Sequence, residues 1–370
     1  MITILGAGPG GLALAHILER NGVECIVYEA DLSAKSRHQG GMLNINEDTG
    51  QRALKLAGLY DAFQARVLVG GDALRLRDRD GQLLLDAPGN GSRPEIDRGS
   101  LRELFLDAID PKLVRWNTKV TRVDREESGF RLLLDDGSSA RADTLIGADG
   151  AWSRARPLLT AEQPEYCGIK FVEYRYLDAD RVYPEVLELI GDGLFFALAD
   201  ERGIVGHREP SSELCLYAAA KLPEDWGRHG LTRQQVIELF PGWNSSFHRA
   251  LGRSDGELVV RALWALPAGH RWQRAPGVTL LGDAAHVMSP FGGEGVNLAL
   301  TDAADLAEAL LAHPRDTNAA FAAYEAKMFP RAARSAAISA ANLEIAFSKD
   351  GGQRFLEMFT GRRPIDAGAD

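Results

Sequence analysis

Residues 1–11 read Met1-Ile-Thr-Ile-Leu-Gly-Ala-Gly-Pro-Gly-Gly11, and this stretch decides the fold. A short apolar strand ends at Leu5 and runs directly into a G-x-G-x-x-G turn. Helical spacing of apolar residues follows as far as about Arg20, and residues 24–28 predict a second strand. A strand, a glycine-rich turn, a helix and a strand in this order predict the βαβ opening of a dinucleotide-binding fold.

Each glycine of the turn has a separate physical use. Gly6 allows the tight turn, Gly8 lets a pyrophosphate approach the backbone, and Gly11 lets the helix pack closely on the strand. The N-terminus of the helix offers free amides and a positive dipole end to an anion. At the end of the second strand, Glu29 supplies a carboxylate for ribose hydroxyls. The pattern alone leaves open whether the nucleotide is FAD or NAD.

A second glycine-rich turn lies almost 280 residues further on. Gly282-Asp283-Ala284-Ala285-His286 follows a predicted buried strand at residues 278–281. The Asp283 carboxylate would accept hydrogen bonds from sugar-like hydroxyls. A predicted helix from Gly295 to about Ala312 opens just beyond, and its positive end can stabilise a negative charge. A third motif, residues 147–156, places Asp149 after another predicted strand.

These motifs together resemble those of the class A, para-hydroxybenzoate hydroxylase-like flavin-dependent monooxygenases. The resemblance implies that FAD is the cofactor, that Asp283 binds its ribityl hydroxyls and that Asp149 serves FAD and the nicotinamide donor. It also implies that Arg98, at the start of a predicted helix, approaches the flavin. The remaining residues implied to lie at the cofactor follow the second motif: Gly293, Gly295, Val296 and Asn297. Glu294 stands where many relatives have glutamine.

Within this class, the chain is most similar to the tetracycline-inactivating monooxygenases, through residues 27–29, 37–41, 50–59 and 95–98. That match implies that Arg37 meets NADPH or NADH and that Asn44 meets FAD in place of an aspartate. The residues that would contact a tetracycline differ, because Ala199, Glu173 and Leu194 replace a histidine, a glutamine and an arginine. A site built for polar contacts loses discrimination without them. The predicted substrate pocket comprises Glu173, Pro290, Phe291 and Gly292.

The pattern of elements predicts an α/β fold with a Rossmann-like FAD-binding domain, an inserted β-rich substrate domain and a C-terminal helix. The FAD-binding domain would span residues 1–167 and 270–320. The substrate domain would span 168–269, and the C-terminal helical segment 321–362. A predicted hairpin at 66–88 belongs either to the FAD-binding domain or to the substrate side.

The composition narrows the classes of partner. The chain has 370 residues and a formal net charge of -10, which disfavours nucleic acid or an anionic membrane as the main partner. The N-terminus shows no export signal and no 18-residue apolar run occurs, so we expect a cytoplasmic enzyme without an integral membrane segment. Three scattered cysteines predict neither disulfides nor a metal site. The Ala-rich tail fits a monomer or a weak homodimer.

The resemblance implies that the enzyme consumes NADPH or NADH and dioxygen. It would hydroxylate an aromatic or polyketide-like small molecule through a flavin hydroperoxide. Three alternatives stay open: a flavin-dependent reductase or dehydrogenase of the same fold, a tetracycline-inactivating hydroxylase, and a flavoprotein without turnover. A single histidine without partners at ligand spacing is more often packed than catalytic, so His286 is interpreted first as structural.

Overall fold

The computed structural model describes residues 1–36 and 41–361. Its chain forms two compact units, each built from three separate stretches. Unit 1 consists of residues 1–67, 96–165 and 264–340, and unit 2 of residues 68–95, 166–263 and 341–370. The chain therefore leaves unit 1 and returns to it more than once, and each unit is described by itself.

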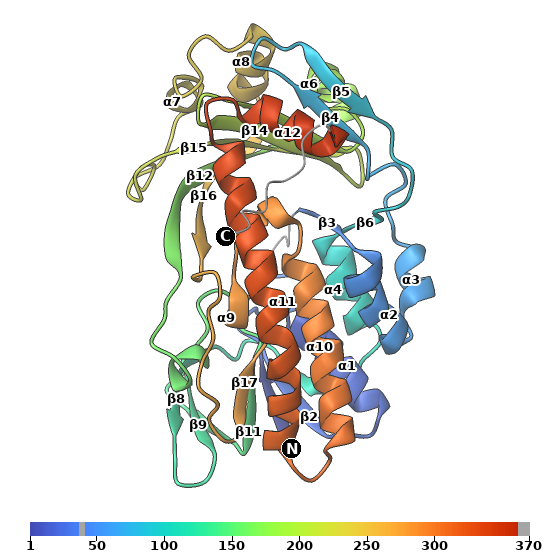
Figure 1. Cartoon of the computed structure of the whole chain (residues 1–370), viewed down its shortest axis with the longest axis vertical. Coiled ribbons are helices and arrows are strands. Elements are labelled where there is room, and N and C mark those ends of the chain that lie inside the picture. The colour runs from blue at the N-terminus through green and yellow to red at the C-terminus, as the bar shows by residue number, and fades with distance from the viewer. Residues whose placement is uncertain (37–40, 362–370) are drawn as a thin grey trace. The chain divides into compact units, whose positions relative to one another are not determined.

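Unit 1 is built on a parallel sheet of five strands in the order β17-β11-β1-β2-β7. These strands are β1 (Ile2–Leu5), β2 (Cys25–Tyr28), β7 (Val114–Arg115), β11 (Thr144–Gly147) and β17 (Val278–Leu280). All four residues of β1 are buried, as expected for a parallel strand covered on both faces. Figure 1 shows α1 (Pro9–Arg20) beside α10 (Gly295–Ala312), and α11 (Thr317–Ala346) runs along α10.

The other elements of unit 1 are short. They are β3 (Met42–Asn44), η1 (Glu47–Gln51), α2 (Arg52–Ala57), α3 (Tyr60–Gln64), β6 (Glu95–Asp97), α4 (Arg98–Leu106), η2 (Pro111–Leu113), β8 (Val120–Arg125), β9 (Phe130–Leu134), β10 (Ser139–Ala142), η3 (Arg156–Leu158), α9 (Asp283–His286) and η4 (Pro290–Gly292). Strands β10-β9-β8 form an antiparallel sheet, and β3 pairs with β6.

Three sequence-based element predictions are wrong in detail, two in unit 1 and one at the C-terminal end of the chain. Helical spacing of apolar residues over 49–63 predicts one helix, but the chain is broken at Gly58, whose φ of +70° ends α2 in the left-handed conformation. Three short segments, 120–124, 130–134 and 141–146, predict an antiparallel meander, but the third contributes its first residues to β10 and its last to β11 of the parallel sheet. The tail is two helices, α11 and α12 (Gly351–Thr360).

Unit 2 is built on a seven-stranded sheet in the order β16-β12-β15-β14-β13-β4-β5. Its strands are β4 (Leu74–Arg77), β5 (Leu83–Ala87), β12 (Glu165–Tyr176), β13 (Leu194–Ala199), β14 (Arg202–Glu209), β15 (Glu213–Lys221) and β16 (Asp255–Ala265). Its helices include α5 (Ala179–Val182), α6 (Pro184–Ile190), α7 (Arg233–Ile237) and α8 (Ser245–Gly252).

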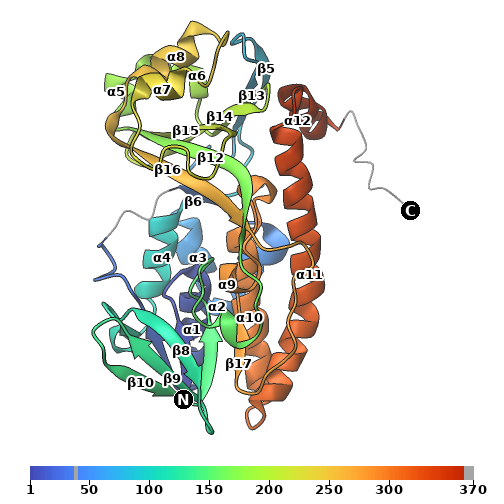
Figure 2. The same cartoon turned by 90° about the vertical axis from the view of Figure 1, so that its left-hand side faces the viewer.

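The two faces of the unit 2 sheet differ. Figure 2 shows α5, α6, α7 and α8 gathered on one face, where Tyr174, Phe195 and Leu216 pack with Phe240 and Phe247 in one apolar core. Because side chains alternate along a strand, Glu173, Phe196 and Cys215 point to the other face. There, Phe196 contacts Phe355 of α12, with ring centroids 5.4 Å apart.

The predicted α/β fold with a Rossmann-like sheet is confirmed. Among the helices of the described residues, none combines the length and the apolar character that crossing a bilayer requires.

Candidate functional site

Four positions of the predicted motifs lie at one edge of the parallel sheet. Strands β17, β11, β1 and β2 are neighbours in that order. Each runs in the same direction, and each is followed at once by a motif: Asp283 after β17, Asp149 after β11, Gly6 after β1 and Glu29 after β2. The carboxyl ends of such strands are where open α/β sheets bind ligands.

The turn after β1 has room for glycine alone at two positions. A Cβ on Gly6, whose φ is +100°, would lie 2.4 Å from the Ala148 carbonyl oxygen. One on Gly11 would lie 2.1 Å from the Gly6 carbonyl oxygen. At Gly8, in contrast, no described atom lies within 4 Å of a Cβ position. Gly8 is the N-cap of α1 and offers no capping side chain, so it leaves the first amides of the helix without a side-chain acceptor.

Glu29 is tied to this turn through its carboxylate. It accepts hydrogen bonds from the backbone amides of Ala7 (2.6 Å) and Asp31 (2.8 Å). The guanidinium of Arg102, in α4, donates to the Ala7 carbonyl (3.0 Å) and to the Asp31 carboxylate (2.9 Å), and lies 3.6 Å from Glu29. Arg102 is only 3% exposed. It therefore fixes the turn and the acidic strand end to each other.

Arg102 was missed in the sequence analysis, although a signal was present. It sits at the edge of the apolar face of a predicted helix, beside Phe105 and Ile109, where a charged residue is unusual unless it is paired. A buried cation in that place indicates acidic partners nearby, and the strand end with Glu29 and Asp31 supplies them.

The second and third motifs are joined by Arg156. Its side chain donates to the carbonyls of Ala284 (2.8 Å) and Asp283 (3.1 Å) in α9 and to that of Ala151 (2.7 Å). Burial lowers the pKa of Arg156, whereas the charges of Asp149 and Asp283 raise it. The Asp283 side chain itself is exposed at the start of α9, so it is available to a ligand.

Asp149, which follows β11, has a carboxyl group with a raised pKa. Burial raises the pKa of its carboxyl, and hydrogen bonds from Ser153 and from the Arg154 amide (2.6 Å) oppose that shift. Its Oδ1 atom is buried and has no hydrogen-bond partner among the described residues. A buried carboxylate oxygen without a partner is costly, and a donor from a bound molecule would satisfy it.

A second group of predicted residues surrounds the N-terminus of α10. Glu294 is the N-cap but makes no capping hydrogen bond with its side chain, so the amides of Gly295, Val296 and Asn297 lack an intrahelical acceptor. No described atom lies within 4 Å of a Cβ position on Gly293 or on Gly295. The space beside these glycines is open, as it is beside Gly8 at the start of α1, and a helix end of this kind attracts negative charge.

Asn297, by contrast, uses its side chain within the protein. Its Nδ2 donates to the carbonyls of Asn44 (2.9 Å) and Gly293 (3.1 Å), and its Oδ1 accepts from the Asn46 amide (2.9 Å). Asn46 in turn donates to Glu294 (2.9 Å), a contact that a glutamine at that position would also accept. Burial raises the pKa of Glu294 and the Asn46 hydrogen bond opposes the shift. The buried Nδ2 of Asn44 has no partner among the described residues.

The other predicted positions are placed as follows. Arg98 is the first residue of α4, and its amide donates to the Gly41 carbonyl (3.1 Å). Pro290, Phe291 and Gly292 form the single turn η4 in unit 1. Arg37 lies outside the described residues.

Glu173 belongs to unit 2, where it stands on β12 and pairs with Arg261 at 2.5 Å. The same face of the sheet carries His207, Glu209 and Cys215. Each of these residues offers one potential metal-ligand atom, and the three atoms lie within 4.8 Å of one another. The Arg175 guanidinium lies 3.8 Å from Glu209, and its positive charge disfavours a cation there. Burial lowers the pKa of His207 to about 4, so its ring is neutral at pH 7.

The residues of unit 1 fit FAD. Two uncapped helix ends with open glycine positions suit a pyrophosphate and a charged flavin ring, and Asp283 and Glu29 suit the sugar hydroxyls. The unpaired atoms of Asp149 and Asn44 supply an acceptor and a donor for further polar groups.

Comparison with known proteins agrees with this fit. The model of the FAD binding domain family matches residues 1–339. Monooxygenase asqM of Emericella nidulans is 29% identical over 430 aligned residues, covering 96% of this chain and 97% of asqM. The 3-amino-4-hydroxybenzoate 2-monooxygenase PtnB3 of Streptomyces platensis is 29% identical, covering 89% of this chain and 84% of PtnB3.

Solved structures share the fold. Klebsiella pneumoniae HpxO, complexed with FAD and uric acid, superposes with a TM-score of 0.78 at 24% identity, covering 98% of this chain and 92% of HpxO. Tetracycline destructase Tet(51) superposes with a TM-score of 0.74 at 19% identity, covering 98% of this chain and 95% of its own. At these identities, the two structures show the fold alone.

The chain therefore belongs to the FAD binding domain family. Within that family it is an FAD-dependent monooxygenase. The resemblance to class A flavin monooxygenases is confirmed, and so is FAD as the cofactor.

Proposed function

We propose that this monooxygenase uses NADPH or NADH and dioxygen to hydroxylate an aromatic or polyketide-like small molecule. The balanced reaction inserts one oxygen atom into a C–H bond of the substrate and reduces the other to water, while the nicotinamide donor loses a hydride. The observation that carries the proposal is the convergence of Gly8, Glu29, Asp149 and Asp283 at one sheet edge.

FAD, when bound, supplies the redox chemistry, and the residues of the chain position it and shield it from water. We assign the ADP half to Gly8, Gly11 and Glu29, and the ribityl chain to Asp283. The amides at Gly293, Gly295, Val296 and Asn297 would stabilise negative charge on the ring, as a helix N-terminus does. Arg98, Asn44 and Asp149 are assigned to the cofactor, and Arg37 to the nicotinamide donor, through the family resemblance.

The substrate class is inferred from the relatives, since PtnB3 is named for an aminohydroxybenzoate and HpxO is complexed with uric acid. We assign Glu173, Pro290, Phe291 and Gly292 to substrate contact. Three changed residues, Ala199, Glu173 and Leu194, disfavour a tetracycline. We further propose residues 1–167 with 270–320 as the FAD-binding domain, 168–269 as the substrate domain and 321–362 as the C-terminal helical segment. The hairpin at 66–88 is assigned to the substrate side, because residues 68–95 belong to unit 2. We propose a cytoplasmic monomer or weak homodimer.

The cofactor assignment is tested by Asp283→Ala. The purified variant should lose its yellow flavin absorbance, because the exposed carboxylate no longer binds the ribityl hydroxyls. Asp107→Ala is the matched control, since Asp107 is 70% exposed and pairs only loosely with Arg66 at 3.3 Å. An Asp283→Ala protein that keeps its full flavin content would disprove the assignment.

The reaction is tested by NADPH oxidation under oxygen with 3-amino-4-hydroxybenzoate, urate and related phenols as candidate substrates. Stimulated oxidation together with a product heavier by one oxygen atom is expected. The rival reductase or dehydrogenase would oxidise NADPH with substrate under anaerobic conditions and leave the product without added oxygen. A flavoprotein without turnover would show neither.

A further inference from the structure

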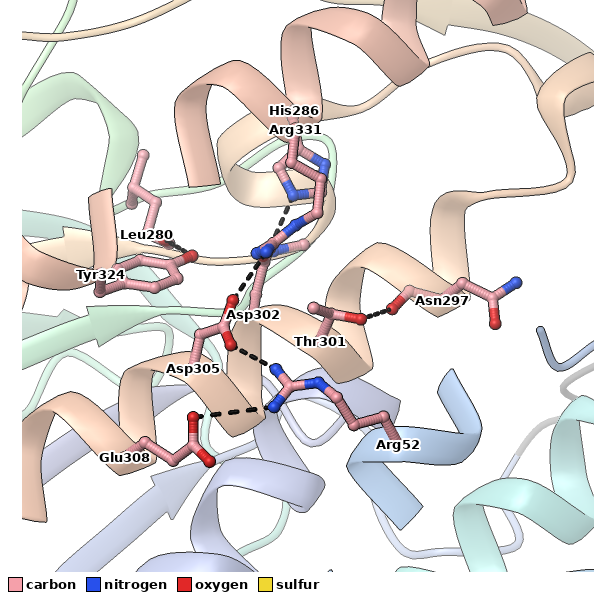
Figure 3. A network of polar contacts seen from close by, with 11 residues as sticks. Arg52, Leu280, His286, Asn297, Thr301, Asp302, Asp305, Glu308, Tyr324 and Arg331 are labelled. Atoms are coloured by element: carbon pink, nitrogen blue, oxygen red, sulfur yellow. Dashed lines mark hydrogen bonds and ion pairs between the residues drawn. The ribbon is translucent and has the colours of Figure 1, made fainter. Parts of the chain in front are cut away.

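A buried network of charges lies directly behind the turn that carries Asp283. Asp302, in α10, is completely buried. Its Oδ2 atom accepts hydrogen bonds from the Gly282 amide (3.0 Å) and from His286 Nε2 (2.6 Å). Its Oδ1 atom accepts from the guanidinium of Arg331, in α11 (2.8 Å). Figure 3 shows His286 and Arg331 converging on Asp302 from separate elements.

The Asp302 carboxylate holds both ends of one short turn. Gly282 precedes Asp283 and His286 ends α9, so the two donors flank the residue that we assign to the ribityl chain. Between these ends, the amides of Ala285 and His286 bond to the Gly282 carbonyl (2.8 and 2.9 Å). The geometry leaves the backbone at Asp283 little freedom, and the direction of the exposed carboxylate follows from it.

The strand that leads into the turn is held by the neighbouring helix. The Tyr324 hydroxyl, in α11, donates to the Leu280 carbonyl (2.9 Å), and Glu325 accepts from the Thr279 hydroxyl (2.7 Å). Since Arg331 lies on the same helix, α11 contacts both the end of β17 and the network behind α9. The turn is thereby fixed from two helices.

Asp305, one helical turn from Asp302, shares part of this network. It accepts from Arg331 (2.7 Å) and pairs with Arg52, which also lies 3.7 Å from Glu308. Asp305 is 4% exposed, so both acids are buried and both contact Arg331. The difference is that the Asp302 carboxylate also binds the turn. Asp305 is therefore a matched control for the effect of removing a buried charge.

We propose that Asp302 and His286 are positioning residues for FAD: Asp302 aligns the Asp283 turn directly and through His286, and FAD affinity depends on this pair. The proposal rests on the proposed function, because it assumes that Asp283 binds FAD. His286 is thus assigned neither to proton transfer nor to mere packing. Its Nδ1 atom has no partner among the described residues, so Nε2 carries its polar contact with Asp302.

The experiment compares Asp302→Asn with Asp305→Asn in the full chain. Apoprotein is titrated with FAD, thermal unfolding is followed without FAD, and visible circular dichroism is recorded with FAD bound. Asp302→Asn should raise the Kd for FAD about 10-fold or more, because hydrogen bonds to a charged group at the turn are weakened. The flavin dichroism should change as well. Asp305→Asn should lower the unfolding temperature while the Kd changes less than about 3-fold.

His286 provides the second pair of variants. His286→Gln retains a side-chain N–H for Asp302 and should keep the Kd for FAD near that of the wild type, whereas His286→Leu should raise the Kd by up to the rise seen in Asp302→Asn. The double variant of Asp302→Asn and His286→Leu should bind FAD no more weakly than Asp302→Asn alone, since that change already weakens the contact between Asp302 and His286. If Asp302→Asn does not fold, the His286 variants decide the question alone.

Two outcomes overturn the proposal. One is an unchanged Kd for FAD in folded Asp302→Asn or His286→Leu, and the other is an equal rise in Asp302→Asn and Asp305→Asn, which would mean a general loss of stability. Asp283→Ala is titrated alongside. If it keeps its FAD affinity, the proposed function fails at that residue; if it alone loses FAD, only the positioning role is wrong.

Discussion

The two units both bury charged side chains, but they use them differently. In unit 1, Arg102, Arg156 and Asp302 bind backbone amides and carbonyls of glycine-rich turns. In unit 2, Glu173 pairs with Arg261, and Arg175 pairs with Glu213, from one strand to another across a sheet. Backbone geometry in unit 1 therefore depends on particular charges, whereas the sheet of unit 2 keeps its own backbone hydrogen bonds.

This difference indicates which unit determines cofactor binding and which unit can vary its side chains. A cofactor shared by a whole family needs turns of one shape, and buried charges that hold those turns serve that need. A sheet face whose polar side chains contact one another can change residues without changing its backbone. We expect substitutions in unit 1 to affect flavin binding and stability together, and those in unit 2 to leave flavin binding intact.

The largest effect is expected for Arg102→Leu. Removing this cation takes the positive charge away from the largely buried carboxylates of Glu29 and Asp31, which typically costs about 3–5 kcal/mol. Urea unfolding should show this loss, and the protein should purify without FAD. In the control Arg66→Leu, the exposed pair with Asp107 is removed and the cost should stay below about 1 kcal/mol. Equal losses in the two variants would contradict the comparison.

A slightly smaller effect is expected for Gly11→Ala. The added Cβ would lie 2.1 Å from the Gly6 carbonyl oxygen, so the turn after β1 must open at a cost of about 3 kcal/mol. FAD binding should fall with it. Gly252→Ala in α8 of unit 2 is the control, because its nearest neighbour, Ile237 Cδ1, would lie 3.8 Å away. That variant should keep both its FAD and its stability.

The two units should respond to pH with opposite signs. In unit 2, burial lowers the pKa of His207 from 6.5 to about 4, so the unfolded chain binds a proton before the folded one does. The stability from neutral His207 is complete above pH 6.5 and is lost as the pH falls towards 4, by up to about 3 kcal/mol.

In unit 1, burial opposes ionisation of His286, but the charge and hydrogen bond of Asp302 outweigh it and raise the pKa. The stability from charged His286 is present below pH 6.5 and is lost as the pH rises through the raised pKa. Urea unfolding from pH 4 to 9 measures both. His207→Gln should flatten the acid side of the plot of unfolding free energy against pH, and His286→Gln should flatten the alkaline side. Plots parallel to that of the wild type would show that these two histidines do not cause the pH dependence.

The same contrast explains what the sequence could predict. Gly6, Gly8 and Glu29 act within a short βαβ unit, so their pattern predicts the turn and a dinucleotide as its ligand, but not which dinucleotide. The roles of Arg102 and Arg156 depend on carbonyls 95 and 128 residues away, a distance that no local pattern spans. The error at residues 141–146 has a related cause. Asp143 alone separates β10 from β11, and only the tertiary fold assigns Leu145 and Ile146 to the buried parallel sheet.

The smallest effect is expected for Glu173→Gln in unit 2. Its partner Arg261 is 56% exposed, so losing the charge of this pair should cost no more than about 1 kcal/mol. The Kd for FAD should stay within about twofold of the wild type, because Glu173 lies on a sheet face that carries no FAD motif. The KM for a substrate that stimulates NADPH oxidation should rise, since we assign Glu173 to substrate contact. A variant that loses FAD while its substrate KM is unchanged would reverse the roles given to the two units: the unit 2 sheet face would then support the cofactor, and the substrate contacts would have to be sought elsewhere in the chain.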